Sequence, residues 1–170
     1  HCFEKFYIPS LGDDEETRED FTEEQVRLIR NMPSSKTIEI DCMIHLMLDT
    51  GLRVKECCGL LVKDINLEAE TPHLVLYKNN IRGMKNKNSQ RLVPLVGASL
   101  IALQKLTRAE LSSYLFPRYV LETENEVKNG SASGACNKRL QALLGDSCPT
   151  SHCFRHTMQT RLRNAECPKD

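Results

Sequence analysis

The chain has 170 residues, a length that fits one domain with a single substantial hydrophobic core. Its 23 basic and 23 acidic residues cancel, and this balance by itself argues against a general nucleic-acid binder. Neither a signal peptide nor an apolar run of membrane length is present, so we expect a cytoplasmic protein with reduced thiols and no membrane contact.

The charges are nevertheless divided between two parts of the chain. Residues 1–70 carry 8 Lys and Arg against 16 Asp and Glu, a net charge of −8. Residues 71–170 carry 15 against 7, a net charge of +8. A basic surface on one side of a molecule is the electrostatic footprint of a DNA binder, so the second part is the candidate for such a surface.

The amino-terminal part predicts an acidic, solvated linker followed by two helices. The spacing from Thr22 to Gln25 is that of a capping box and predicts a helix near residues 22–31. A strongly apolar helix is expected near residues 36–50. Gly51 then stands where a glycine ends a helix in a left-handed turn.

Arg53 and Glu56 follow this glycine directly, in a short helix expected near residues 53–59. An isolated Arg-x-x-Glu is usually a surface pair that contributes little to stability. After a buried helix and a glycine stop, the same pair could instead be a fixed guanidinium that a carboxylate steadies.

A β-hairpin is expected next, with strands near residues 73–78 and 90–95 and a candidate short strand near 65–69. The polar segment that connects the two strands contains several basic residues, among them Lys85 and Lys87. A solvated basic turn is the commoner meaning of such a segment. Alternatively, a flexible lysine ammonium at the tip of a hairpin could reach a ligand.

The rest of the chain is predicted to be helical, near residues 98–108, 132–144 and 151–164, with a loop over residues 122–133. Helices therefore outnumber strands along the whole chain. The pattern indicates a mainly α (α+β) fold with a small antiparallel sheet.

The last predicted helix has two distinct faces. One is an apolar stripe at four-residue spacing, formed by Phe154, Met158 and Leu162. His152, Arg155 and His156 share a different face. With Thr150 or Ser151 as N-cap, this trio lies in the first turn, where the helix dipole favours an anion such as phosphate. An amphipathic surface helix with incidental His and Arg side chains explains this run alone equally well.

Taken together, the motifs resemble the catalytic domain of tyrosine recombinases, also called phage integrases. The resemblance covers roughly residues 20–170 and rests on three runs in the family's order and spacing: Gly51-Leu52-Arg53-Val54-Lys55-Glu56, Lys85 with Arg91-Leu92-Val93-Pro94-Leu95, and His152-Cys153-Phe154-Arg155-His156. Each run alone is weak evidence, whereas three in sequence are strong evidence.

The resemblance implies a helical catalytic domain with a small antiparallel β-sheet and a site-specific DNA recombinase activity. Strand cleavage and rejoining would pass through a 3′-phosphotyrosine intermediate, with no metal and no other cofactor. The implied partner is double-stranded DNA at a specific attachment site, on which the full-length protein would assemble as a tetramer. The implied source is a prophage or another mobile element.

The resemblance also implies the roles of the basic side chains at the reaction centre. Arg53 and Arg155 would hold the non-bridging oxygens of a phosphodiester, because a guanidinium binds such oxygens bidentately. His152 would donate a hydrogen bond to a phosphate oxygen or accept the proton of the nucleophile. Preorganised cations of this kind stabilise the charge of the transition state.

Three further roles follow from the same resemblance. Lys85 would protonate the 5′-oxygen leaving group, and Lys87 is its rival because the hairpin is a residue longer than usual. Glu56 would hold the region of Arg53 in place rather than act as an acid or base. His156 would pack or hydrogen-bond beside Arg155.

The family's nucleophilic tyrosine has no counterpart here. In the family it lies a few dozen residues after the His-x-x-Arg-His run, and all four tyrosines of this chain precede that run: Tyr7, Tyr77, Tyr114 and Tyr119. We therefore expect residues 1–20 to be a linker from a missing N-terminal DNA-binding domain. Residues 21–170 would be a catalytic domain that is truncated at its C-terminal end and inactive alone. The alternative is a non-catalytic DNA-binding or regulatory protein that retains the fold.

The eight cysteines allow two interpretations. Four of them lie in apolar or helical surroundings, where a free cysteine is usually a small buried hydrophobe: Cys42, Cys57, Cys58 and Cys136. Cys148, His152, Cys153 and His156 lie close together in the sequence and raise the alternative of a zinc site. No Cys-x-x-Cys pair occurs, so we expect no metal.

Overall fold

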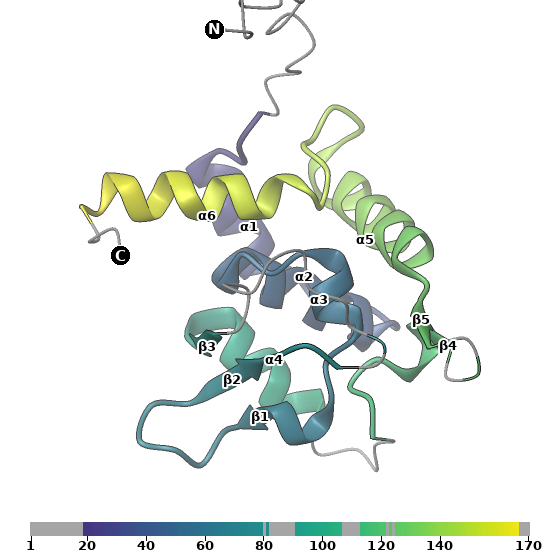
Figure 1. Ribbon diagram of the computed structural model, residues 1–170. Helices are drawn as coiled ribbons and strands as arrows, with labels where there is room; N and C mark the ends of the chain where they lie inside the picture. The colour runs from purple at the N-terminus through teal and green to yellow at the C-terminus, as the bar shows by residue number, and fades with distance from the viewer. Residues whose placement is uncertain are drawn as a thin grey trace, which may run out of the picture.

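The structure, a computed structural model, describes residues 19–79, 81, 91–106, 113–121, 123 and 125–166. These residues form the α-helices α1 (Glu23–Arg30), α2 (Ile38–Thr50), α3 (Val54–Cys58), α4 (Gly97–Leu106), α5 (Asn129–Leu144) and α6 (Cys153–Asn164), the 3-10 helices η1 (Val62–Asp64) and η3 (Pro117–Tyr119), and the strands β1 (Ile65–Asn66), β2 (His73–Leu76), β3 (Arg91–Pro94), β4 (Val120–Leu121) and β5 (Glu126–Val127). The predicted mainly α fold with a small antiparallel sheet is confirmed (Figure 1). Within the described residues, no helix combines the length and apolar character needed to cross a membrane.

Helix α2 is the central element of the helical body, and the five other α-helices lie around it (Figure 1). It is apolar on nearly every side, so nine of its 13 residues are buried. Two of the buried residues are acidic and bind its neighbours. Asp49 accepts hydrogen bonds from the Arg30 side chain at 2.8 Å and from the backbone N–H of Ser99 at 3.1 Å. Asp41 accepts one from Arg139 Nε at 2.9 Å, which ties α5 to the central helix.

Local sequence signals determine where α1 begins and where α2 ends. The Thr22 hydroxyl accepts the backbone N–H of Gln25 at 3.2 Å, and the Gln25 side chain accepts that of Thr22 at 3.0 Å. This is the predicted capping box, and α1 begins at the next residue. Helix α2 ends at Thr50, and Gly51 follows with φ of 65°, the predicted left-handed turn.

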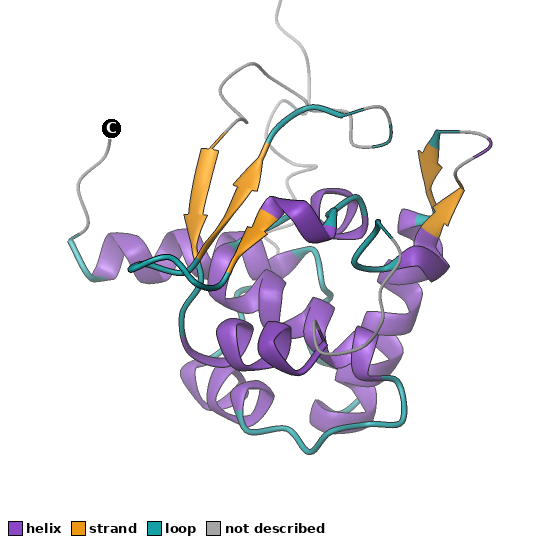
Figure 2. Cartoon of the chain, turned by 90° about the horizontal axis from the view of Figure 1, so that it is seen from below, coloured by secondary structure: helices purple, strands orange, loops and turns teal. Residues whose placement is uncertain are grey.

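The three-stranded sheet is antiparallel, in the order β1-β2-β3, and lies beside the helical body (Figure 2). Leu74 pairs with Val93, and both side chains are buried, whereas the neighbouring pair of Val75 and Leu92 is exposed. This alternation follows from the two-residue period of a strand, which turns successive side chains to opposite faces. The segment that joins β2 to β3 holds Lys85 and Lys87, and both lysines lie outside the described residues.

The predicted loop over residues 122–133 is wrong in its second half. Val127 is buried in β5, which pairs with β4 in a small second hairpin, and α5 begins at Asn129. The first residues of this helix are small or polar and carry no apolar periodicity. Ala132, Cys136 and Leu140 are nevertheless fully buried at four-residue spacing, so tertiary packing determines where the helix starts.

The predicted N-cap of the last helix is also wrong. Helix α6 begins at Cys153 with His152 at the N-cap, and no side chain there caps the helix. Ser151 instead binds helix α5: its backbone N–H donates to Asn137 Oδ1 at 2.8 Å, and its hydroxyl lies 3.2 Å from that of Ser133. Ser151, which the local spacing predicted as a cap of α6, is therefore bound to α5 instead.

The four cysteines predicted to be buried hydrophobes are buried in the core. Burial raises the pKa of Cys58 and of Cys136 to about 12. These thiols therefore stay protonated at neutral pH and act as small apolar side chains.

Candidate functional site

Arg53, His152 and Arg155 come together on the wall of one pocket of about 530 Å³. The pocket lies between α3, the first residue of α5 and the beginning of α6. Its lining consists of Leu52, Arg53, Val54, Lys55, Asn129, Ser151, His152, Arg155, His156 and Gln159. Two segments about a hundred residues apart thus supply one basic concavity.

The turn at the end of α2 determines the position of Arg53. Gly51 reverses the chain in its left-handed conformation, and Arg53 follows as the N-cap residue of α3 with an extended backbone. Glu56, in the first turn of α3, accepts the backbone N–H of Arg53 at 2.9 Å. The side chain of Arg53 remains 43% exposed, so its guanidinium is available to a ligand in the pocket.

Glu56 is the buried carboxylate that organises the arginines on this side of the pocket. One of its oxygens accepts from Arg53 Nη1 at 3.1 Å, and the other accepts from Arg91 Nη2 at 3.3 Å. Burial by itself would raise the pKa of Glu56, but the Arg53 backbone N–H and the Arg91 and Arg53 charges outweigh it and hold the pKa below its ordinary value. Glu56 therefore stays ionised at neutral pH, which suits a structural anion and not a general acid.

Arg155 lines the same pocket from α6. Its Nη1 donates to the carbonyl oxygen of Gly51 at 3.2 Å, which joins α6 to the end of α2. Burial and the nearby charges of Arg53 and Arg91 lower the pKa of Arg155, against the opposing effect of Glu56. An arginine remains charged at neutral pH in spite of such a shift. Besides burial, the charges of Arg53 and Arg91 contribute to this lowering of the pKa, so the three cations lie near enough to repel one another, and an anion placed between them would be stabilised.

His152 and His156 are exposed and line the same pocket from the first turn of α6. In the described part of the chain, no three His, Cys, Asp or Glu side chains are grouped as metal ligands would be. In the pocket, the two imidazoles line the same wall as the guanidiniums of Arg53 and Arg155. This surrounding suits hydrogen bonding to a phosphate oxygen.

Arg91 belongs to the run Arg91-Leu92-Val93-Pro94-Leu95, whose sequence predicts no role for it. The structure shows that it shares Glu56 with Arg53, from a strand 35 residues away along the chain. Lys55, Asn129 and Gln159 also line the pocket without having been singled out. The i, i+4 relation of Gln159 to Arg155 was the one available signal for these residues.

The tyrosines within the described residues lie elsewhere. Tyr77, Tyr114 and Tyr119 are absent from the pocket lining. Tyr119 is only 3% exposed, and burial raises its pKa. Lys85 and Lys87, the two candidate acids, fall in the part of the hairpin that the structure does not describe.

Sequence similarity points to one protein family. The model of the phage integrase family matches residues 19–170. A probable integrase/recombinase of Acholeplasma phage L2 is 28% identical over 166 residues, which are 91% of this chain and 52% of that protein. The chain thus spans about half the length of the curated relative that it matches.

Solved structures of similar fold come from recombinases and integrases. The crystal structure of XerA recombinase aligns with a TM-score of 0.67 at 17% identity, over 88% of this chain and 50% of that chain. The Tn1549 transposon integrase in complex with transposon right end DNA aligns with a TM-score of 0.63 at 23% identity, over 93% of this chain and 57% of that chain. At these identities the likeness shows the fold.

Proposed function

This chain belongs to the phage integrase family, and we propose that it is the catalytic domain of a site-specific DNA recombinase whose pocket binds the scissile phosphate of duplex DNA. The observation that carries the proposal is that Arg53 and Arg155 line one pocket together with His152. Phosphoryl transfer spreads negative charge over the non-bridging oxygens, and fixed guanidiniums stabilise that charge. The solved DNA complex of the Tn1549 transposon integrase supports DNA as the partner.

The proposed reaction is a transesterification. A tyrosine hydroxyl attacks the phosphorus, a new bond from oxygen to phosphorus forms, and the bond to the 5′-oxygen breaks. His152 takes the tyrosine proton, and Lys85, or Lys87 in its place, gives a proton to the departing 5′-oxygen. The product is a 3′-phosphotyrosine, a diester like the substrate, so the reverse reaction can rejoin the strand without an external source of energy.

We further propose that the nucleophile belongs to a part of the natural protein outside these 170 residues. The described tyrosines do not line the pocket, and Tyr119 is buried, which supports a nucleophile from elsewhere. In this proposal residues 1–20 are a linker and residues 21–170 the catalytic domain. The full-length protein would act as a tetramer at a DNA attachment site.

A second candidate function is a DNA-binding or regulatory protein that keeps the fold without catalysis. The absence of the described tyrosines from the pocket favours it. The presence of Arg53, His152 and Arg155 in one pocket favours catalysis, since phosphate binding alone does not require all three.

A trapped-adduct experiment distinguishes the two functions. The 170-residue chain and the natural full-length protein are each incubated with a nicked suicide duplex that carries the attachment site, and covalent protein–DNA adducts are separated on a denaturing gel. We expect an adduct from the full-length protein and none from the 170-residue chain. Failure of the full-length protein to form an adduct would favour the non-catalytic function, and an adduct from the short chain would place the nucleophile among its own tyrosines.

A further inference from the structure

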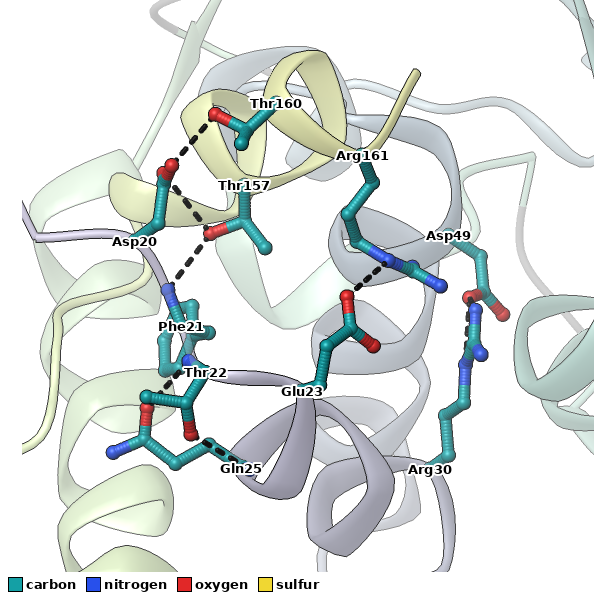
Figure 3. Close-up of polar contacts among 10 residues, drawn as sticks. All are labelled: Asp20, Phe21, Thr22, Glu23, Gln25, Arg30, Asp49, Thr157, Thr160 and Arg161. Carbon is teal, nitrogen blue, oxygen red and sulfur yellow. Dashed lines mark hydrogen bonds and ion pairs between the residues drawn. The ribbon is translucent and has the colours of Figure 1, made fainter. Parts of the chain in front are cut away.

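Helix α6 is bound by the short segment that precedes α1 (Figure 3). The pocket residues Arg155, His156 and Gln159 occupy one side of the helix. Thr157 and Thr160 point toward Asp20 and Phe21, which belong to the segment before α1 (Figure 3). With about 100° of rotation per residue, Thr157 lies about 200° around the helix from Arg155, nearly opposite to it. A shift of the helix at Thr157 therefore displaces Arg155 as well.

The contacts between this segment and α6 form a continuous set of hydrogen bonds. The backbone N–H of Phe21 donates to Thr157 Oγ1 at 3.0 Å. The Thr157 hydroxyl donates to one oxygen of Asp20 at 3.4 Å, and the Thr160 hydroxyl donates to the other at 2.6 Å. Thr157 is only 2% exposed, so its hydroxyl is a buried group that accepts one hydrogen bond and donates another.

An aromatic stack reinforces these bonds. The rings of Phe21 and Phe154 lie 4.6 Å apart between centroids, at an interplanar angle of 16°. Both side chains are buried, Phe154 completely. Phe154 immediately precedes Arg155, so the stack and the hydrogen bonds together restrain the sliding and the rotation of the first two turns of α6.

We propose that Asp20 and Thr157 are positioning residues for the pocket, which hold α6 at the height and rotation that bring Arg155 and His152 into one pocket with Arg53. The catalytic part of this inference rests on the proposed function. Positioning on this scale matters because a misplacement of about 1 Å at a reaction centre can reduce a rate about a hundredfold. The device is distinct from the pocket, because neither Asp20 nor Thr157 lines it.

The test compares two substitutions of one hydroxyl. Thr157→Val keeps the shape of the side chain but can neither accept from Phe21 nor donate to Asp20. Thr157→Ser restores both hydrogen bonds. Leu106→Ala, at the buried end of α4, is the stability control, because it opens the core in a helix that contributes nothing to the pocket. Asp20→Asn serves as a second, milder variant in case Thr157→Val does not fold.

Two measurements are made on each variant. In the full-length protein, the rate constant of suicide-substrate cleavage at saturating DNA is compared with the dissociation constant for the same duplex. We expect Thr157→Val to lower the rate constant by at least about tenfold, with less than about threefold change in the dissociation constant. Thr157→Ser should cleave nearly like the wild type, and so should Leu106→Ala, below the melting temperature of each variant. Asp20→Asn should fall between the wild type and Thr157→Val.

The second measurement is amide hydrogen exchange in the 170-residue chain, which requires no activity. Exchange at residues 153–158 should be faster in Thr157→Val than in Leu106→Ala. Unchanged exchange there, cleavage equal to that of Leu106→Ala, or failure of Thr157→Ser to restore the rate would each overturn the positioning role. If the wild-type protein does not cleave DNA, the proposed function fails, and the exchange experiment still decides whether Thr157 holds α6.

Discussion

The guanidinium of Arg155 donates a hydrogen bond to the carbonyl oxygen of Gly51 at 3.2 Å, although the two residues are 104 positions apart. Gly51 also makes the left-handed turn from which Arg53 follows two residues later. One short turn therefore sets the positions of both guanidiniums. The last carbonyl groups of a helix have no hydrogen-bond donor within the helix. The bond from Arg155 therefore supplies a donor to the Gly51 carbonyl at the end of α2.

Gly51→Ala should lower the stability of the folded protein. A side chain at φ of 65° costs about 1–2 kcal/mol in the left-handed region. Its Cβ would also lie 3.4 Å from the Cβ and Cγ of Met158, at the short end of ordinary van der Waals contact with α6. We expect the free energy of unfolding to fall by at least about 1 kcal/mol in a urea titration.

Gly134→Ala is the matched control for this substitution. A Cβ at Gly134 meets nothing within 4 Å, and the residue lies inside α5 without a positive φ. Alanine is the better helix former by about 1 kcal/mol, so this variant should be as stable as the wild type or more so. A Gly51→Ala variant as stable as Gly134→Ala would contradict the strain argument.

Arg155→Ala should abolish most cleavage by the full-length protein while leaving the fold intact. Removal of one donor to a charged transition state typically costs on the order of a hundredfold or more in rate. The side chain is only half-buried, and its one hydrogen bond to another described residue is to Gly51, so the free energy of unfolding should fall by at most about 3 kcal/mol. Arg163→Ala, an exposed arginine of the same helix outside the pocket, is the control and should cleave normally. Equal rates for the two variants in a single-turnover assay would remove Arg155 from the phosphate site.

The parts of the fold that sequence reasoning predicted correctly depend on short-range chemistry. The capping box of Thr22 and Gln25 spans three residues, and the turn at Gly51 depends on the conformational freedom of one glycine. The strand predicted near residues 73–78 is present at His73–Leu76 and likewise depends on its own residues. Each of these signals is complete within a few residues, so it can be identified without knowledge of the remaining chain.

The parts that were missed depend on contacts between distant residues. Nothing near Ser151 indicates that Asn137, on another helix, takes its backbone N–H. In the same way, Arg91 reaches Glu56 from a strand 35 residues away. Arg53, His152 and Arg155 could be named from the sequence because their motifs stand in the order and spacing of the family. The contacts that orient these residues form only when the chain folds.

Glu56→Gln should destabilise the protein in a manner that depends on pH. The pKa of Glu56 is held below its ordinary value of 4.5, so its ionised form stabilises the folded state. That contribution is fully present above pH 4.5 and is lost as the pH falls through the lowered folded pKa. At pH 7 the variant loses charged hydrogen bonds to Arg53 and Arg91, which we expect to cost about 1–3 kcal/mol.

Urea titrations at neutral and acidic pH measure this effect. The difference in unfolding free energy between wild type and Glu56→Gln should be largest at pH 7 and should shrink on acidification below pH 4.5. Glu23→Gln is the control, because Glu23 is 76% exposed in its pair with Arg161, and such surface pairs contribute little. A Glu56→Gln difference that stays constant with pH would mean that the carboxylate charge is not what holds the arginines.

The 170-residue chain should bind duplex DNA weakly, and its affinity should fall steeply as salt rises. Binding that depends on phosphate contacts releases counterions, and removal of one cation that touches a phosphate reduces the slope of log affinity against log salt by about 1. Arg53→Ala and Arg155→Ala should therefore each reduce the slope by about 1, because both guanidiniums line the pocket. Lys105→Ala is the control, since Lys105 lines a different pocket, between α2 and α4. Fluorescence anisotropy over a series of salt concentrations gives the slopes. If Lys105→Ala lowers the slope as much as the two arginine variants do, DNA binding is not specific to this pocket and depends on cations elsewhere on the protein as well.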